Sequence, residues 1–545
     1  MRVLVLAVLA AWLGFGFNTA SAEVTHPPLE AYGDLPSIRY MALSPDGSIV
    51  AFAERREGAD YLVTFDFATR QKTYHVKIDD VATRDIWFAD EENIVILASE
   101  TKFVIGFRGE FEYSGAFSFS LKTKKLTFLL RGTDNIYPAQ GDLGRIVGDD
   151  ADPGYIFMPA YVGDRYFHPN YSLLRVNLKT GKGRRFKSGV DNTVDWFVDK
   201  DGTVLAREDY NNTTDTYRVY TYVNGKRELI YELETSQLPP GVTGIKADRS
   251  ALLFSDGSDA DDSGNVYELD FSGHLTPASL GGKGGTIERI IKDGNRFVLG
   301  VEYSGAVPSY KFYDPDVDAA VSGMVNQFST ASVNLVSWTD DWSKLLYLIY
   351  GSDTPGSYVL QDRETGQMML VADERDNIPP DAIGQMVSVN YKARDGLNIP
   401  SILTWPAGVD IETASKLPLV VMPHGGPESY DAVGFDWMAQ YFANRGYLVL
   451  QPNFRGSSGY GTEHRILGKG EWGGKMQDDI TDGVQTLVEQ GLADPTRVCI
   501  VGASYGGYAA LAGGAFTPDL YKCVVAIAPV SDIRPLLVDV KWDNG

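Results

Sequence analysis

The residues best suited to chemistry are a serine flanked by glycines near the end of the chain. The apolar run 497–501 leads directly into 502–506, which reads Gly-Ala-Ser-Tyr-Gly, and a helical pattern follows. This arrangement is typical of a nucleophile elbow, in which a sharp turn between a buried strand and a helix exposes the serine hydroxyl. The N-terminus of the helix favours developing negative charge at the same place. Ser504 is therefore the candidate nucleophile for acyl transfer.

Acyl transfer also needs hydrogen-bond donors for the oxyanion that forms during attack. The apolar run 417–422 ends in 423–427, which reads Pro-His-Gly-Gly-Pro. A loop of this type supplies one backbone N–H, and the residue after the nucleophile supplies another. We assign Gly426 and Tyr505 as the two donors. His424 either contacts the substrate or only packs within the loop, and both alternatives stay open.

The usual partners of the serine do not follow it. In α/β-hydrolases an acid and then a histidine come after the nucleophile along the chain, whereas all six histidines here precede Ser504. Three aspartates come after both Ser504 and the apolar run 523–527, but they follow that run too closely to be the expected acid. These are Asp532, Asp539 and Asp543. Substitution of His424 or His464 as the base is a weaker hypothesis. His424 lies on the oxyanion side, and His464 follows a Gly-rich loop and has no identifiable partner for that role.

The chain before residue 376 repeats one pattern, a polar turn rich in Asp and Gly followed by an apolar strand and then a second strand. The turns are marked by Asp46, Asp90, Asp150, Asp199, Asp248, Asp293 and Asp340. A period of roughly 40–50 residues with about four short strands is typical of β-propeller blades. The repeat predicts an all-β, seven-bladed β-propeller, and an irregular pair of β-sandwiches is the weaker alternative.

The pattern changes near residue 376. Adjacent prolines in 377–381 favour an extended connection. Beyond it, a hairpin around 394–396 precedes apolar runs that alternate with helical patterns, which predicts a mainly parallel sheet covered by helices. We expect a propeller over 23–376 and an α/β-hydrolase domain over 385–545 that is incomplete at its C-terminus.

Several spaced motifs together resemble the prolyl oligopeptidase family of serine peptidases, especially its acylaminoacyl-peptidase and dipeptidyl-peptidase-like branches. The motifs are 424–427, 453–461 (Asn-Phe-Arg-Gly-Ser-Ser-Gly-Tyr-Gly), Trp472-Gly473, Asp478-Asp479 and 502–508. The resemblance implies a propeller that caps an α/β-hydrolase domain. It also implies hydrolysis of short peptides through an acyl-enzyme on Ser504, without a cofactor or a metal ion.

The same resemblance bears on substrate preference. Dipeptidyl peptidases of the family hold the substrate amine with paired glutamates in the propeller. The one such pair here is Glu91-Glu92, and its place in a polar turn favours an ordinary solvated position. We therefore expect an acylaminoacyl or oligopeptidase preference rather than a dipeptidyl one.

The N-terminus indicates an exported protein. Arg2, the apolar run 3–17 and Ala-Ser-Ala at 20–22 predict a signal peptide over 1–22 rather than a membrane anchor, since a spanning helix needs about 20 apolar residues. The net charge of −23 disfavours nucleic acid and anionic membranes as partners. The two cysteines, Cys499 and Cys523, lie in apolar runs, which favours two buried free thiols over a disulfide. We expect a periplasmic or extracellular location.

Two interpretations of the whole protein remain. In the first, the sequence is an incomplete copy of an exported serine peptidase, inactive as it stands because the acid and the histidine of the triad are absent. In the second, it is a non-catalytic exported protein that binds ligands through its propeller. Two smaller patterns indicate no site: 256–265 does not match the ligand spacing of an EF-hand, and 281–285 lacks the ending of a phosphate-binding loop.

Overall fold

The computed structural model describes residues 24–78, 81–103, 109–137, 140–163, 169–236, 241–255, 266–278, 286–351, 354–532 and 534. The predicted signal peptide and the segments 256–265 and 281–285 lie outside the described residues. In the described part of the chain, no helix is long and apolar enough to cross a membrane.

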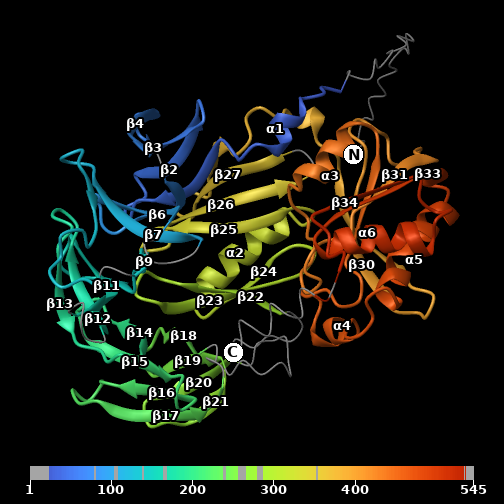
Figure 1. Ribbon diagram of the computed structural model, residues 1–545. Coiled ribbons are helices and arrows are strands. Elements are labelled where there is room, and N and C mark those ends of the chain that lie inside the picture. The colour runs from blue at the N-terminus through green and yellow to red at the C-terminus, as the bar shows by residue number, and fades with distance from the viewer. Residues whose placement is uncertain are drawn as a thin grey trace, which may run out of the picture.

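The first domain consists of small antiparallel sheets that follow one another along the chain (Figure 1). Its strands are β1 (Ile38–Leu43), β2 (Ile49–Arg56), β3 (Ala59–Asp66), β4 (Gln71–Ile78), β5 (Ala82–Phe88), β6 (Asn93–Phe103), β7 (Glu110–Ser120), β8 (Leu126–Phe128), β9 (Asp142–Leu143), β10 (Gly148–Asp149), β11 (Tyr155–Val162), β12 (Asn170–Asn177), β13 (Gly183–Lys187), β14 (Thr193–Val198), β15 (Val204–Asn211), β16 (Thr216–Thr221), β17 (Glu228–Glu234), β18 (Gly241–Lys246), β19 (Ala251–Ser255), β20 (Val266–Asp270), β21 (Leu275–Pro277), β22 (Ile287–Lys292), β23 (Phe297–Tyr303), β24 (Ser309–Phe312), β25 (Ser332–Trp338), β26 (Lys344–Gly351), β27 (Thr354–Asp362) and β28 (Met368–Asp373). Four sheets have four strands each: β1–β4, β10–β13, β14–β17 and β25–β28. A five-stranded sheet contains β5–β9, and a seven-stranded sheet contains β18–β24 because β18 pairs with β23.

The faces of neighbouring sheets pack on one another, and the last sheet packs on the first. Val50 and Phe52 of β2 share a buried cluster with Leu346 and Leu348 of β26. Similar clusters join the other neighbouring sheets around the domain. Because every sheet buries its apolar faces against its neighbours in a closed ring, the predicted propeller is present, and the β-sandwich alternative does not describe this domain. The count of seven blades requires the seven-stranded sheet to be divided in two, and it stays a prediction.

The second domain is a mixed sheet covered by helices, as predicted. After a 3₁₀ helix at Pro380–Ala382, its strands are β29 (Met386–Lys392), β30 (Asn398–Thr404), β31 (Leu417–Val421), β32 (Leu448–Pro452), β33 (Ala493–Ala503) and β34 (Cys523–Ile527). Its helices are α3 (Trp437–Asn444), α4 (Thr462–Ile466), α5 (Lys475–Glu489) and α6 (Tyr505–Phe516). The strand order is β29-β30-β32-β31-β33-β34, and the pairs from β32 to β34 are parallel. Helices α5 and α6 contribute to the core on one face of the sheet and α3 to the core on the other.

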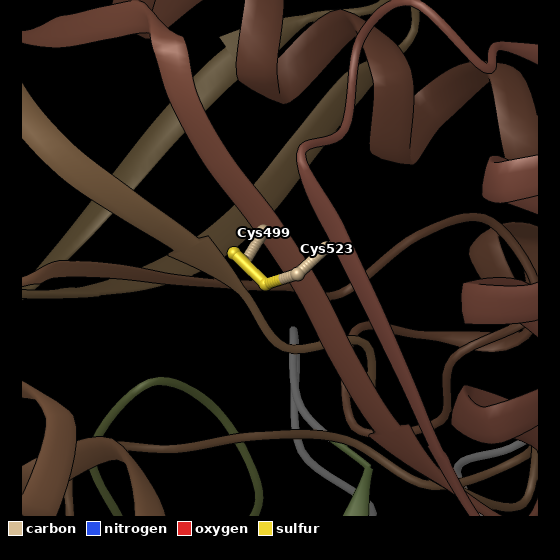
Figure 2. Close-up of a disulfide and its surroundings, with 2 residues drawn as sticks. All are labelled: Cys499 and Cys523. Atoms are coloured by element: carbon tan, nitrogen blue, oxygen red, sulfur yellow. A yellow bond between two sulfur atoms is a disulfide. The ribbon is translucent and has the colours of Figure 1, made fainter.

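The prediction of two free thiols is wrong, because Cys499 and Cys523 form a disulfide (Figure 2). The two residues are direct partners in the parallel pairing of β33 with β34, and their Cα atoms lie 4.7 Å apart. The apolar sequence of β34 suggested burial, but β34 is the edge strand and most of its residues are exposed. The bridge ties this edge strand to the strand that leads to Ser504.

Residues before the propeller pack on the second domain. Helix α1 (Leu29–Gly33) carries Tyr32, a fully buried residue whose ring lies beside those of Phe435 and Tyr441. The side-chain amide of Asn444 donates a hydrogen bond to the carbonyl of Thr25 (2.8 Å). The N-terminal segment therefore bridges the two domains.

The chain enters and leaves the propeller at one place. The backbone N–H of Ser37 donates to the carbonyl of Glu374 (2.7 Å), and its hydroxyl donates to the same oxygen (2.8 Å). The guanidinium of Arg375 donates to the carbonyl of Asp34 (2.7 Å). The two connecting segments are thus hydrogen-bonded to each other.

Candidate active site

Ser504 occupies a sharp turn between β33 and α6. Its backbone angles are φ 55° and ψ −118°, a strained combination for a residue with a side chain. Its N–H donates to the carbonyl of Ile527 (3.0 Å), and its carbonyl accepts from the N–H of Tyr508 (3.0 Å). A Cβ atom on Gly506 would lie 2.1 Å from the carbonyl oxygen of Pro423, so only glycine fits there. The strand, turn and helix predicted around Ser504 are therefore present.

The glycine loop after β31 lies beside this turn. A Cβ atom built on Gly425 would lie 3.5 Å from Cβ of Ser504, which is ordinary van der Waals contact. The next residue, Gly426, has φ 115°, a conformation that side chains disfavour. Tyr505 is the first residue of α6, so its backbone N–H has no acceptor within the helix. The two predicted oxyanion donors thus belong to the two segments that flank the serine.

His424 packs within the loop. Its Nδ1 lies 2.7 Å from the carbonyl oxygen of Gly425, and its Nε2 lies 2.8 Å from the hydroxyl oxygen of Ser457. Its ring stacks on that of Phe454 at a centroid distance of 4.5 Å. Because a carbonyl only accepts, Nδ1 carries the proton, and burial lowers the pKa of His424 to about 4. A neutral ring with both nitrogens engaged favours the packing role over contact with substrate.

His464 is also engaged elsewhere. Its Nε2 lies 3.0 Å from the carbonyl oxygen of Asn453 and 3.1 Å from that of Phe454. Among the described residues, no side chain forms a hydrogen bond with the hydroxyl of Ser504. The geometry therefore gives no support to the hypothesis that His424 or His464 replaces the missing base.

The acids that follow the nucleophile do not complete a triad either. Asp532 forms an ion pair with Arg534 (2.7 Å) and lies near the surface. Asp539 and Asp543 lie outside the described residues. The described residues around Ser504 therefore include neither the acid nor the base of a triad.

A buried ion pair holds the motif 453–461 against α5. Arg455, whose side chain is 3% exposed, donates from NH2 to Oδ1 of the fully buried Asp479 (2.7 Å) and from Nε to Oδ2 (2.8 Å). Its backbone N–H donates to the same carboxylate (2.9 Å). On its outer side the guanidinium contacts Asp395 (2.9 Å), which is 38% exposed. These contacts explain an arginine and an aspartate that sequence spacing alone left without a role.

Two more motif residues support the loops around Ser504. The side chain of Asn453 accepts from the N–H of Asp431 (2.7 Å) and donates to the carbonyl of the same residue (2.9 Å), which fixes the chain after the glycine loop. The ring of Trp472 packs edge-on against Tyr505 at a centroid distance of 4.7 Å. The spaced motifs therefore converge on one centre.

The propeller contains a charged cavity of about 560 Å³. One of its lining residues, Glu288, accepts a hydrogen bond from Tyr430 (3.0 Å), four residues after Gly426 in the chain. A second cavity of about 500 Å³ shares Arg145 with the first and is lined by three tyrosines. The tyrosines are Tyr137, Tyr161 and Tyr171. The two cavities thus lie side by side in the propeller, and Glu288 links the first of them to the loop beside the nucleophile.

Glu208 is the buried acid of the charged cavity. Its Oε1 accepts from the hydroxyl of Tyr217 and from the N–H of Val242 (2.7 Å), and burial raises the pKa of Glu208 to about 7. None of the described residues donates a hydrogen bond to its Oε2. By contrast, the neighbouring Asp195 is paired with Arg296 (2.9 Å). Sequence analysis missed Glu208, because an acid beside Asp209 within one strand carries no spacing signal for a site.

The pair Glu91-Glu92 lies elsewhere, in the turn between β5 and β6. Glu92 accepts a hydrogen bond from the hydroxyl of Ser120 (3.0 Å) and lines a different groove. Of the acids in the propeller, Glu208 rather than this pair lines the cavity that is linked to the loop beside Ser504.

Comparison with known proteins finds a family match for one segment of the second domain. Residues 433–541 match the prolyl oligopeptidase family. This segment belongs to the prolyl oligopeptidase family. Its relatives include dipeptidyl aminopeptidase BIII of Pseudoxanthomonas mexicana, which is 35% identical over 235 residues, or 42% of this chain and 34% of that protein. The human acylamino-acid-releasing enzyme is 30% identical over 142 residues, 26% of this chain and 19% of that protein.

The match spans about a third or less of the length of these curated prolyl oligopeptidase relatives. Solved structures are similar over more of the chain. The Mycobacterium tuberculosis puromycin-hydrolyzing peptidase has a TM-score of 0.60 at 17% identity, covering 94% of this chain and 81% of that one. The Pyrococcus horikoshii acylaminoacyl peptidase has a TM-score of 0.62 at 16% identity, covering 93% and 79%. At these identities the structures show a shared fold.

The match confirms, over residues 433–541, the resemblance drawn from the motifs. The roles assigned to Ser504, Gly426 and Tyr505 stay predictions.

Proposed function

We propose that the protein is a serine peptidase that cleaves short peptides through an acyl-enzyme on Ser504. The observation that carries the proposal is the strained turn that presents Ser504 between β33 and α6, with the glycine loop in contact with it. In the proposed mechanism the serine oxygen attacks the peptide carbonyl, and the N–H groups of Gly426 and Tyr505 stabilise the oxyanion. The peptide C–N bond then breaks and the amine departs with a proton, and water hydrolyses the acyl-ester to free the serine.

Proton transfer in this mechanism needs an acid and a base from outside the described residues. In support, the described part of the chain offers no base to Ser504, and the edge strand β34 exposes Val524, Val525 and Ile527, an apolar surface on which further elements can pack. We propose that the 545-residue chain is inactive as it stands for this reason. The proposed architecture counts seven blades, with β18–β21 and β22–β24 as two of them.

The charged cavity is the proposed site for the amino end of the substrate. Within the described part of the chain no group donates to Oε2 of Glu208, and a peptide ammonium group is a complementary donor for a buried carboxylate. A free amine fits this site better than an acylated one, which favours dipeptidyl or aminopeptidase specificity over the acylaminoacyl preference expected from the sequence.

A second candidate is a non-catalytic binding protein. The observation in its favour is that the cavity around Glu208 is built entirely from propeller residues and so can bind a peptide without Ser504.

The test compares the 545-residue chain with the longest natural reading frame that contains it, each with a Ser504→Ala variant. We expect the longer protein to hydrolyse Ala-Ala p-nitroanilide, Ser504→Ala to lower kcat at least about a thousandfold, and the 545-residue chain to be inactive. Activity that survives Ser504→Ala refutes the nucleophile assignment. Absence of hydrolysis in both proteins, with equal peptide binding in the variants, supports the binding protein. Faster cleavage of an N-acetylated substrate refutes the role of Glu208.

A further inference from the structure

The propeller carries a basic groove on a protein whose net charge is −23. The groove has a volume of about 720 Å³ and is lined by residues of two sheets, β5–β9 and β10–β13. These sheets are neighbours in the propeller (Figure 1). The turn between β7 and β8 contributes Lys122 and Lys125, and the turn between β12 and β13 contributes Lys179. We call these three residues the groove lysines. Their charge is opposite to that of the protein as a whole.

The groove lysines have no ion-pair partner among the described residues. The two carboxylates that also line the groove are already engaged. Asp90 accepts from the N–H of Gly154 (2.8 Å), and Glu92 accepts from the hydroxyl of Ser120 (3.0 Å). The ammonium groups are therefore available to a ligand.

The lysines are not required by the turns that carry them. Lys122 and Lys179 occupy equivalent positions, each directly before a threonine whose N–H is capped by a side chain three residues earlier. The same capped turn occurs in the first and last sheets, where Ala68 and Glu364 stand in place of the lysine. Because alanine and glutamate also occupy this position, the turn itself does not require lysine, and the two lysines in adjacent sheets remain to be explained by a ligand.

We propose that this groove binds a small soluble polyanion with at least two phosphate or sulfate groups. Oxygens of such groups accept charge-assisted hydrogen bonds from ammonium groups on both turns. Thr180 adds a hydroxyl donor, since its Oγ1 only accepts a weak bond from the N–H of Lys182 (3.4 Å). The net negative charge of the whole protein repels an extended anionic surface, which favours a small ligand over a lipid headgroup in a membrane.

The experiment measures binding of inorganic tripolyphosphate to the full chain by titration calorimetry at low and high salt. The groove variant is Lys122→Gln/Lys125→Gln/Lys179→Gln. The control removes the same number of positive charges from three exposed lysines that do not line the groove. It consists of Lys226→Gln, Lys392→Gln and Lys522→Gln. We expect the groove variant to bind at least about tenfold more weakly than the wild type, and the control to stay within about twofold. Thermal unfolding shows whether each variant is folded. If the triple variant does not fold, the single variant Lys179→Gln replaces it, and we expect a smaller loss of affinity from it.

Sedimentation with phosphatidylglycerol vesicles separates the two sources of phosphate. The proposal is overturned by absence of binding to tripolyphosphate, or by an equal loss in the groove variant and the control, which indicates attraction without a site. It is also overturned if the vesicles retain the wild type and release the groove variant while tripolyphosphate does not bind.

Discussion

Replacement of Asp479 by asparagine tests the buried ion pair beneath the candidate site. Asp479 is fully buried and receives three hydrogen bonds from Arg455, two from the guanidinium and one from the backbone. Asn keeps the shape but removes the charge, which leaves a guanidinium only 3% exposed with a single charged partner among the described residues, Asp395. Breaking a buried pair costs about 3–5 kcal/mol, and we expect the lower end of this range because Asp395 remains.

Asp395→Asn is the matched control, since it removes a carboxylate from the same guanidinium. Asp395 is 38% exposed, so solvent screens this contact and the expected loss is about 0–1 kcal/mol. Urea unfolding followed by circular dichroism gives the free energies, and hydrogen exchange in α5 assigns the loss to the second domain. Losses within about 1 kcal/mol of each other for the two variants would refute the argument that burial sets the strength of this contact.

Three further predictions concern the cavity, the turn and the disulfide. The pKa of Glu208 is about 7 when folded against 4.5 for an ordinary glutamate, so this group lowers the free energy of unfolding as pH rises from about 4.5 to about 7. Glu208→Gln removes this pH dependence of the free energy of unfolding. In urea unfolding, the stability of the variant relative to the wild type should rise by up to about 3 kcal/mol between pH 5 and pH 8. A relative stability that is the same at both pH values contradicts the raised pKa. Gly506→Ala places a methyl group against Pro423 and should lower stability by about 1–3 kcal/mol in thermal unfolding, while Gly323→Ala, with open space around it, should not lower it. Cys523→Ser should cost about 3 kcal/mol for a loop of 24 residues, and dithiothreitol should lower the unfolding midpoint of the wild type but not of this variant.

The parts of the fold that could be predicted are those written in local sequence. The Asp-Gly turns recur with every sheet of the propeller, and the glycines around Ser504 mark a turn that other residues cannot form. The helices and strands of the second domain were likewise predictable, because the spacing of apolar residues differs between helical segments and strands. Local chemistry was sufficient in each of these cases.

Features that depend on register or on distant contacts could not be predicted. Cys499 and Cys523 face each other only because two parallel strands align in one of several possible registers. Pairing of β18 with β23, which merges strands into one sheet, joins segments separated by two hairpins. Glu208 gains its raised pKa from burial among residues of other strands, and nothing beside it in the sequence indicates that environment.

The paired connections at Ser37 and Glu374 limit how the two domains can move. The chain crosses between the domains twice, and the crossings are hydrogen-bonded side by side. Two adjacent tethers resist sliding and separation and leave rotation about a line through them as the main relative motion, once contacts such as the hydrogen bond of Tyr430 with Glu288 break. A spectroscopic ruler placed far from that line reports the full motion, whereas one placed beside Arg375 reports almost none of it.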